Sequence, residues 1–293
     1  MAAKDLALGT VQFGLDYGAT NTAGQVSEAE AVAILARAEA AGIDTLDTAS
    51  AYGDSERVVG NCHAGGRFRI VTKTSPLKRV KIGDEELADI SNRFQQSLTA
   101  LRANSVAALL VHDTGDLLCA GGDRLWALME TWKAERRAAK IGISVYDVPE
   151  LENVLARFPV EIVQLPLNAF DQRFAQPGLI AKLKANAIEV HARSAFLQGL
   201  LLAVPAEVPE RLAKLRPAVA RWREVCAAAG AAPAAAALAF TRSAGVDRTV
   251  IGVQSASQLD EIVAASSRTP VIDFRPFAAT DPALADPRRW AAR

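Results

Sequence analysis

The feature of this chain that most restricts its fold is a regular alternation of short apolar runs with segments of helical period. The apolar runs are almost continuously hydrophobic, which is typical of strands buried on both faces of a parallel sheet. We expect strands at residues 6–10, 43–46, 68–73, 106–111, 140–144, 161–165, 188–193 and 248–251. Strands that alternate with helices in this way predict the α/β class.

The segment between the first two strands shows how a helix is recognised in this sequence. Ser27 and Glu30 have the spacing of a capping box, and Gly42 supplies a left-handed stop. Between them, one helical face carries the apolar residues Ala31, Ile34, Leu35 and Ala38. By similar criteria, helices are expected at residues 54–62, 84–101, 125–132, after 149, and at 178–186, 209–229, 234–243 and 256–265.

Polar residues follow the carboxyl ends of many predicted strands, namely Asp47, Lys73, His112, Ser144, Gln164 and Arg193. In a closed (β/α)8 barrel these ends form one ring around a single site. An open doubly wound sheet is the competing arrangement, but no G-x-G-x-x-G motif follows the first strand. We therefore predict a (β/α)8 TIM barrel as a single domain over residues 1–293, with the proline-containing residues 268–293 as a tail wrapped over the barrel.

Composition excludes several classes of protein. Among 293 residues, Lys+Arg and Asp+Glu are equal at 33 each, so no overall charge attracts nucleic acid or an anionic membrane. Three scattered cysteines suit a reducing compartment and offer no metal-ligand spacing. The chain has no apolar run of membrane-spanning length and no apolar signal region at its start. We expect a cytoplasmic protein without nucleic-acid, membrane or metal partners.

Four polar residues have complementary chemistry. The phenol of Tyr52 is a poor acid, with an ordinary pKa of about 10, and a buried ammonium beside it would lower that pKa. Lys73 can supply the ammonium and Asp47 its counter-charge, while the imidazole of His112 can polarise a carbonyl oxygen. Each residue alone has an ordinary structural explanation, but their joint placement favours a shared site. A proton donor of this kind requires a hydride donor, which NAD(P)H or a flavin provides.

Five motifs in chain order resemble those of the aldo-keto reductases. They are IDTLDTASAYG at residues 43–53, VTK at 71–73, LVHD at 110–113, IGIS at 141–144 and RSAFLQGL at 193–200, and the likeness spans nearly the whole chain. The resemblance implies a (β/α)8 barrel, an extended nicotinamide cofactor and reduction of aldehydes or ketones. It further implies that Tyr52 is the general acid, that Lys73 and Asp47 tune it, and that His112 positions the substrate carbonyl.

The same resemblance implies a site for the nicotinamide ring. Ser144 and Gln164 would bind the carboxamide, with Asn168 just beyond the same strand. Arg193 replaces an aromatic residue that usually stacks on the nicotinamide, and a planar guanidinium can also stack. Pairing of Arg193 with an acid at the barrel rim is the alternative. Val145 occupies a position where many relatives have asparagine.

The pyrophosphate and adenosine are expected along residues 251–261, where backbone N–H groups and a helix N-terminus suit phosphate. The predicted contacts in this segment are Gly252, Val253, Gln258 and Glu261, the last as an acid that contacts adenine. The segment lacks the Lys or Arg that usually binds the 2′-phosphate of NADP. NAD and NADP are therefore both candidates, with NADP slightly favoured by the family at large.

The leading functional hypothesis is an NAD(P)H-dependent carbonyl reductase that acts on a small molecule. One alternative is a regulatory protein that binds the cofactor without turnover and reports its redox state to a protein partner. Another is an NAD-dependent aldose or alcohol dehydrogenase. Residues 16–17, 170–174 and the tail are expected to form the rim that selects the substrate.

Overall fold

The computed structural model describes residues 3–62, 67–279 and 285–290. Eight parallel strands close into one barrel, in which β8 pairs with β1. The strands are β1 (Leu6–Gly9), β2 (Thr45–Asp47), β3 (Arg69–Lys73), β4 (Val106–Val111), β5 (Ala138–Ser144), β6 (Ile162–Pro166), β7 (Glu189–Arg193) and β8 (Arg248–Gly252). The predicted (β/α)8 barrel is confirmed, and every predicted strand is present with only small shifts of its ends.

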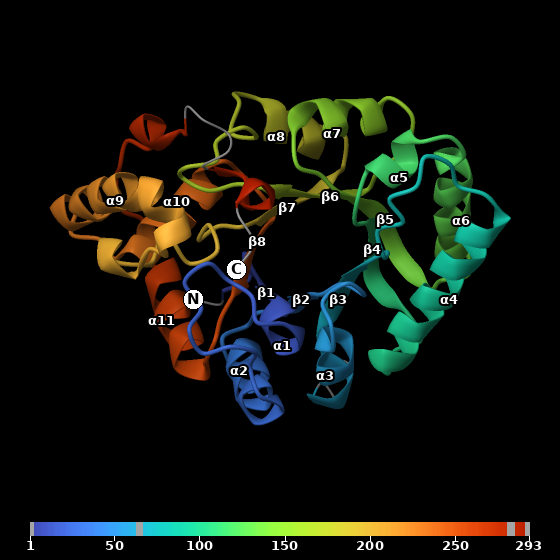
Figure 1. Cartoon of the computed structure of the whole chain (residues 1–293), viewed down its shortest axis with the longest axis horizontal. Helices are drawn as coiled ribbons and strands as arrows, with labels where there is room; N and C mark the ends of the chain where they lie inside the picture. The colour runs from blue at the N-terminus through green and yellow to red at the C-terminus, as the bar shows by residue number, and fades with distance from the viewer. Residues whose placement is uncertain (1–2, 63–66, 280–284, 291–293) are drawn as a thin grey trace.

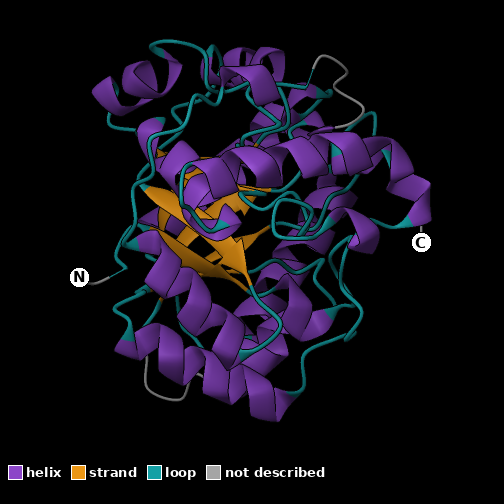
Figure 2. Ribbon diagram, turned by 90° about the vertical axis from the view of Figure 1, so that its left-hand side faces the viewer, coloured by secondary structure: helices purple, strands orange, loops and turns teal. Residues whose placement is uncertain are grey.

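Helices surround the barrel on its outer side (Figures 1 and 2). The connecting helices are α2 (Glu28–Ala40), α3 (Ser55–Cys62), α4 (Asp84–Ala100), α6 (Gly122–Ala134), α7 (Val148–Leu155), α8 (Leu179–Ala185), α10 (Pro233–Ser243) and α11 (Ala256–Ser266). The short helices α1 (Val11–Gly14) and α5 (Gly115–Leu118) were not predicted. The helix predicted at 209–229 is divided into a 3-10 segment, η2 (Glu210–Leu215), and α9 (Arg216–Ala228). Pro217 accounts for this division, because proline favours the first turn of a helix.

The cap of α2 differs from the predicted capping box. The Ser27 hydroxyl accepts a hydrogen bond from Glu30 N at 3.2 Å, and Gly42 has the expected positive φ of 80°. The carboxylate of Glu30, however, accepts from Ala256 N at 2.7 Å instead of turning back to Ser27. Glu30 therefore joins α2 to the N-terminus of α11, and only half of the capping box forms.

The apolar core lies mainly between the strands and the helices. A small separate cluster fills the barrel interior and consists of Val71, Ala108, Leu110 and Ile162. The described part of the tail contains η3 (Arg275–Phe277) and η4 (Pro287–Arg289). The ring of Phe277 lies 5.2 Å from that of Trp222 on α9, so this part of the tail packs on the helical layer. Residues 280–284 and 291–293 of the predicted tail lie outside the described residues.

No single helix in the described part of the chain is long and apolar enough to cross a membrane. One pair of segments, Glu210–Ala228 and Pro233–Ser243, meets that test only when joined across a 90° bend. Trp222 and Ala236 of this pair are fully buried in the hydrophobic core.

Candidate active site

The centre of the candidate site is a buried ion pair between the carboxyl ends of β2 and β3. Lys73 is 2% exposed and Asp47 is 4% exposed. Lys73 Nζ donates to both carboxylate oxygens of Asp47 at 2.8 Å and to Thr48 O at 2.9 Å. The strand register pairs Asp47 with Val71, so the two strands end side by side. Burial lowers the pKa of Lys73, although the Asp47 carboxylate opposes this effect.

Tyr52 and His112 lie against this pair. Lys73 Nζ is 5.0 Å from the centroid of the Tyr52 ring. The rings of Tyr52 and His112 meet edge to face, with centroids 5.7 Å apart, and both residues line a cavity of about 340 Å³ together with Asp47. His112 Nδ1 is buried and has no hydrogen-bond partner among the described residues. The structure therefore brings together the four residues that were predicted to act as one group.

The pKa of Tyr52 is shifted in the direction opposite to the sequence-based expectation. Burial raises it and the Asp47 carboxylate raises it further, whereas the guanidinium of Arg193 lowers it. The expected net lowering of this pKa does not occur, because burial and the Asp47 carboxylate outweigh the charge of the nearby Lys73 ammonium. Tyr52 is therefore protonated at neutral pH, as a phenol of ordinary pKa also is, and this is the state that a proton donor needs.

His112 is held neutral, and this has a consequence for stability. Burial, with the charges of Lys73 and Arg193, lowers the pKa of His112 from 6.5 to about 3. Between pH 6.5 and 3 the unfolded chain therefore binds a proton at His112 that the folded protein does not bind. Above pH 6.5 this histidine causes no loss of stability, and the stability of the folded protein falls as the pH is lowered from 6.5 toward 3.

We expect His112→Gln to reduce the loss of stability on acidification, measured by urea unfolding at neutral and mildly acidic pH. An equal loss in wild type and variant would contradict this cause.

Five of the predicted cofactor residues line the cavity that contains Tyr52, namely Ser144, Gln164, Arg193, Gly252 and Gln258. Ser144 and Gln164 are partners in the register of β5 and β6. Gln164 Nε2 donates to Asp47 Oδ1 at 2.6 Å. Its Oε1 atom is buried and has no hydrogen-bond partner among the described residues. A ligand with an N–H or O–H group could therefore donate a hydrogen bond to this oxygen.

The structure does not bring Asn168 or Val253 into this cavity. Asn168 Nδ2 donates to Ser194 O at 3.0 Å, and its Oδ1 accepts from the backbone N–H groups of Phe170 and Asp171 at 2.9 Å. These bonds shape the loop after β6 and use the carbonyl oxygen and one N–H donor of the amide. Val253 is 1% exposed and belongs to the hydrophobic core. Both side chains therefore serve the fold.

A second and larger cavity of about 1630 Å³ adjoins the first. The residues that line both are Thr20, Asn21, Gly199, Leu202 and Gln258. Glu261 lines the second cavity, as do Arg211 and Arg268, which the sequence alone did not single out. The two cavities form one groove that passes the N-terminus of α11.

Comparison with known proteins agrees with the fold and the motifs. A model of the aldo/keto reductase family matches residues 5–274. The chain belongs to the aldo/keto reductase family. It is therefore a member of a family of oxidoreductases, and the predicted resemblance is confirmed.

Solved structures of aldo-keto reductases have the same architecture. The holo form of an aldo-keto reductase from Bacillus halodurans is 21% identical, with a TM-score of 0.76 over 94% of this chain and 93% of that one. A glycerol dehydrogenase from Gluconobacter oxydans is 18% identical, with a TM-score of 0.66 over 89% and 86%. At these identities the likeness concerns the fold. No curated protein gives a significant match.

In this aldo-keto reductase the N-terminus of α11 differs from the expected phosphate site. Gln254 N donates to the Gln258 side chain at 2.7 Å, and Gln258 N donates to the Ser255 hydroxyl at 3.1 Å. Ala256 N donates to the Glu30 carboxylate at 2.7 Å. Three of the backbone donors in the segment predicted to bind phosphate are therefore already paired with side chains, and one of these side chains is an anion.

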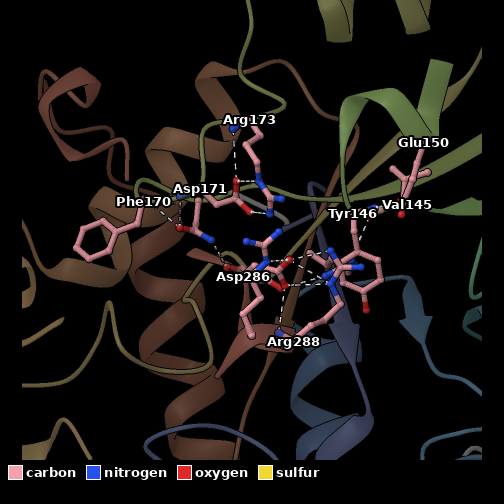
Figure 3. Close-up of polar contacts among 12 residues, drawn as sticks. Val145, Tyr146, Glu150, Phe170, Asp171, Arg173, Asp286 and Arg288 are labelled. Carbon is pink, nitrogen blue, oxygen red and sulfur yellow. Dashed lines mark hydrogen bonds and ion pairs between the residues drawn. The ribbon is translucent and has the colours of Figure 1, made fainter. Parts of the chain in front are cut away.

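The structure also adds residues to the site that no sequence motif marked. Tyr146 follows β5 and lines the cavity beside Arg193, and Arg288 of the tail lies against the same ring (Figure 3). Their association depends on tertiary contacts, so no local signal reveals it. Tyr17, expected at the rim, does line the cavity. Phe170, also expected there, is 4% exposed and belongs instead to the hydrophobic core.

Proposed function

We propose that this aldo-keto reductase is a nicotinamide-dependent carbonyl reductase in which Tyr52 gives a proton to the carbonyl oxygen. The observation that carries the proposal is the convergence of Tyr52 and His112 on one cavity beside the buried Lys73–Asp47 pair. A bound nicotinamide cofactor supplies the hydride in such chemistry. Side chains of the protein itself bind and orient the substrate or transfer a proton.

The surroundings of each side chain support its role. Tyr52 is protonated at neutral pH, and His112 is neutral, so its ring can form a hydrogen bond to a carbonyl oxygen without adding charge. As the proton leaves Tyr52, negative charge develops on the phenol oxygen. The ammonium of Lys73, 5.0 Å from the ring centroid, favours that charge, and Asp47 keeps the ammonium in place.

The residues of the groove fit a nicotinamide dinucleotide. The unpartnered Oε1 atom of Gln164 is a buried acceptor, and the carboxamide of nicotinamide carries N–H donors that would satisfy it. Ser144 lies beside it in the strand register and can bond to the same group. The adjoining larger cavity, with Glu261 on its wall, offers space for the adenosine part of an extended cofactor.

Glu30 supports NAD(H) over NADP(H), against the slight preference suggested by the family at large. Its carboxylate accepts from Ala256 N at the N-terminus of α11, the helix that carries Gln258 of the groove wall. An extra phosphate that approached this helix would meet a like charge where it otherwise finds free N–H donors. We therefore propose NAD(H) as the preferred cofactor.

The Glu30→Gln variant tests this preference. We expect it to raise the affinity for NADPH relative to NADH by about threefold to tenfold, because it removes the competing charge. The ratio of the two dissociation constants can be measured by quenching of tryptophan fluorescence. Glu28→Gln is the matched control, since Glu28 lies on the same helix but pairs with Arg57 at 2.6 Å. An unchanged ratio in Glu30→Gln would show that the carboxylate does not set the preference.

The proposed reductase activity is tested by titration with NADH, NAD, NADPH and NADP, followed by absorbance of the reduced nicotinamide in the presence of aldehydes, ketones and sugars. Binding followed by oxidation of the cofactor supports a reductase. Tight binding without oxidation across the panel favours the regulatory alternative and directs the search to a protein partner. Faster oxidation of alcohols or aldoses than reduction of carbonyls at matched pH favours a dehydrogenase.

A further inference from the structure

Arg193 brings a positive charge into the cavity that Tyr52 and His112 line. Its Nη2 atom donates to Val145 O at 3.1 Å, and its Nη1 atom lies 3.5 Å from the Ser194 hydroxyl. Both partners are uncharged. Within residues 3–62, 67–279 and 285–290, no carboxylate forms an ion pair with Arg193. A guanidinium has five N–H donors, so several are available to a ligand.

The other charges at the cavity cancel one another. The carboxylate of Asp47 is held by Lys73 through two hydrogen bonds of 2.8 Å. Tyr52 is protonated and His112 is neutral at neutral pH, as their shifted pKa values show. Arg193 therefore carries the excess charge of the cavity. A partly enclosed site with one uncompensated cation attracts an anion.

The ring of Tyr146, which the C-terminal tail also contacts, packs against this cation without neutralising it. Arg193 Cζ lies 4.1 Å from the centroid of the Tyr146 ring, and Arg288 Cζ lies 3.6 Å from the same centroid (Figure 3). The charge of Arg288 is balanced by the buried carboxylate of Asp286, with Nη2 and Oδ2 at 2.7 Å. A guanidinium that is already immobilised loses less entropy when it binds a ligand.

We propose that Arg193 binds a carboxylate of the substrate, so that the enzyme selects carbonyl compounds with an acidic group a few bonds from the carbonyl carbon. This inference rests on the proposed reductase function. The carbonyl oxygen then lies at Tyr52 and His112, while the carboxylate accepts hydrogen bonds from Arg193. The cavity of about 340 Å³ must also hold the nicotinamide ring beside Ser144 and Gln164, so the room left near Tyr52 and His112 suits a short oxo acid. Stacking of Arg193 on the nicotinamide, as the family resemblance suggests, leads to a different experimental result.

The experiment compares 4-oxobutanoate with butanal, an aldehyde of equal chain length without the acid. We expect the wild type to favour the acid in kcat/KM by at least about tenfold, because a hydrogen bond to a charged group is stronger than one to a neutral group. Arg193→Gln should bring the ratio close to one. Arg193→Lys should keep part of the preference, since it retains the charge without the planar fork. The control is Arg275→Gln, which removes a tail arginine that is 89% exposed and should keep the wild-type ratio.

The possible outcomes separate this inference from the proposed function. Reduction of both aldehydes with a ratio near one in the wild type, or with the same ratio in Arg193→Gln, overturns the inference alone. Equal loss of both activities together with weaker cofactor binding in Arg193→Gln indicates stacking on the cofactor and also overturns it. If no carbonyl compound is reduced, the proposed function fails. Calorimetric titration with 4-hydroxybutanoate and butan-1-ol then measures the same preference as a ratio of dissociation constants, and equal affinities overturn the inference.

Discussion

The Tyr52→Phe variant is expected to lose turnover by about 10²-fold to 10⁴-fold, the range that a positioned proton donor contributes. It should bind the reduced cofactor almost as tightly as the wild type. The phenylalanine ring can keep the contacts of the tyrosine ring with Lys73 and His112, so the change removes only the hydroxyl. The measurement is cofactor oxidation under saturating carbonyl substrate, with cofactor affinity determined separately by fluorescence.

Tyr17→Phe provides the comparison for this result. Tyr17 also lines the cavity, and burial raises its pKa to about 12. Its hydroxyl accepts a hydrogen bond from Gln198 at 3.3 Å, whereas the Lys73 ammonium lies over the ring of Tyr52. Removal of the Tyr17 hydroxyl should therefore reduce turnover by less than removal of the Tyr52 hydroxyl. Comparable activity in the two variants would remove Tyr52 from the role of general acid.

Replacement of Lys73 by methionine should destabilise the folded protein by about 3–5 kcal/mol, the cost of leaving one member of a buried ion pair without its partner. The carboxylate of Asp47 is 4% exposed and would retain only the hydrogen bond from Gln164 among the side-chain contacts described above. Urea unfolding at neutral pH measures the change in the free energy of unfolding. The double variant Asp47→Asn/Lys73→Met should recover much of the loss, because it removes the uncompensated charge.

A surface ion pair serves as the control for this measurement. Arg93 and Asp89 are in contact at 2.9 Å on one helix, with side chains that are 50% and 47% exposed. Arg93→Met should therefore cost less than about 1 kcal/mol, because water screens an exposed pair. If Lys73→Met costs no more than Arg93→Met, or if the double variant is no more stable than Lys73→Met, the pair does not stabilise the fold in the way described.

The fold and the centre of the site could be predicted because they depend on local pattern. The apolar period distinguishes strands from helices, and parallel strands in a closed barrel must place their carboxyl ends on one rim. Asp47 and Lys73 end their strands and His112 directly follows one, so the barrel alone brings them together. Tyr52 lies in the short loop that follows β2 and so reaches the same rim of the barrel. No long-range side-chain contact has to be known in advance for this part.

The remainder of the site depends on contacts that sequence spacing does not specify. Glu30 has the spacing of a capping box, yet its carboxylate binds Ala256, 226 residues further along the chain. Asn168 stands just past a strand end, as a cofactor contact would, but its amide is used by the loop that it shapes. The pKa of Tyr52 could not be predicted either, because its direction depends on burial and on how fully Asp47 balances Lys73.

The contact between Arg288 and Tyr146 also has a practical consequence for handling the protein. The described chain ends beside the mouth of the cavity, whereas near its start Ala3 N bonds to Ala41 O at 2.9 Å, before the first strand and at the opposite end of the barrel. We expect an affinity tag, fusion partner or surface linker attached beyond Trp290 to lie near the Arg288–Tyr146–Arg193 contacts and to disturb them. The same attachment at the N-terminus leaves them undisturbed, and immobilised preparations used for activity measurements should be tethered there.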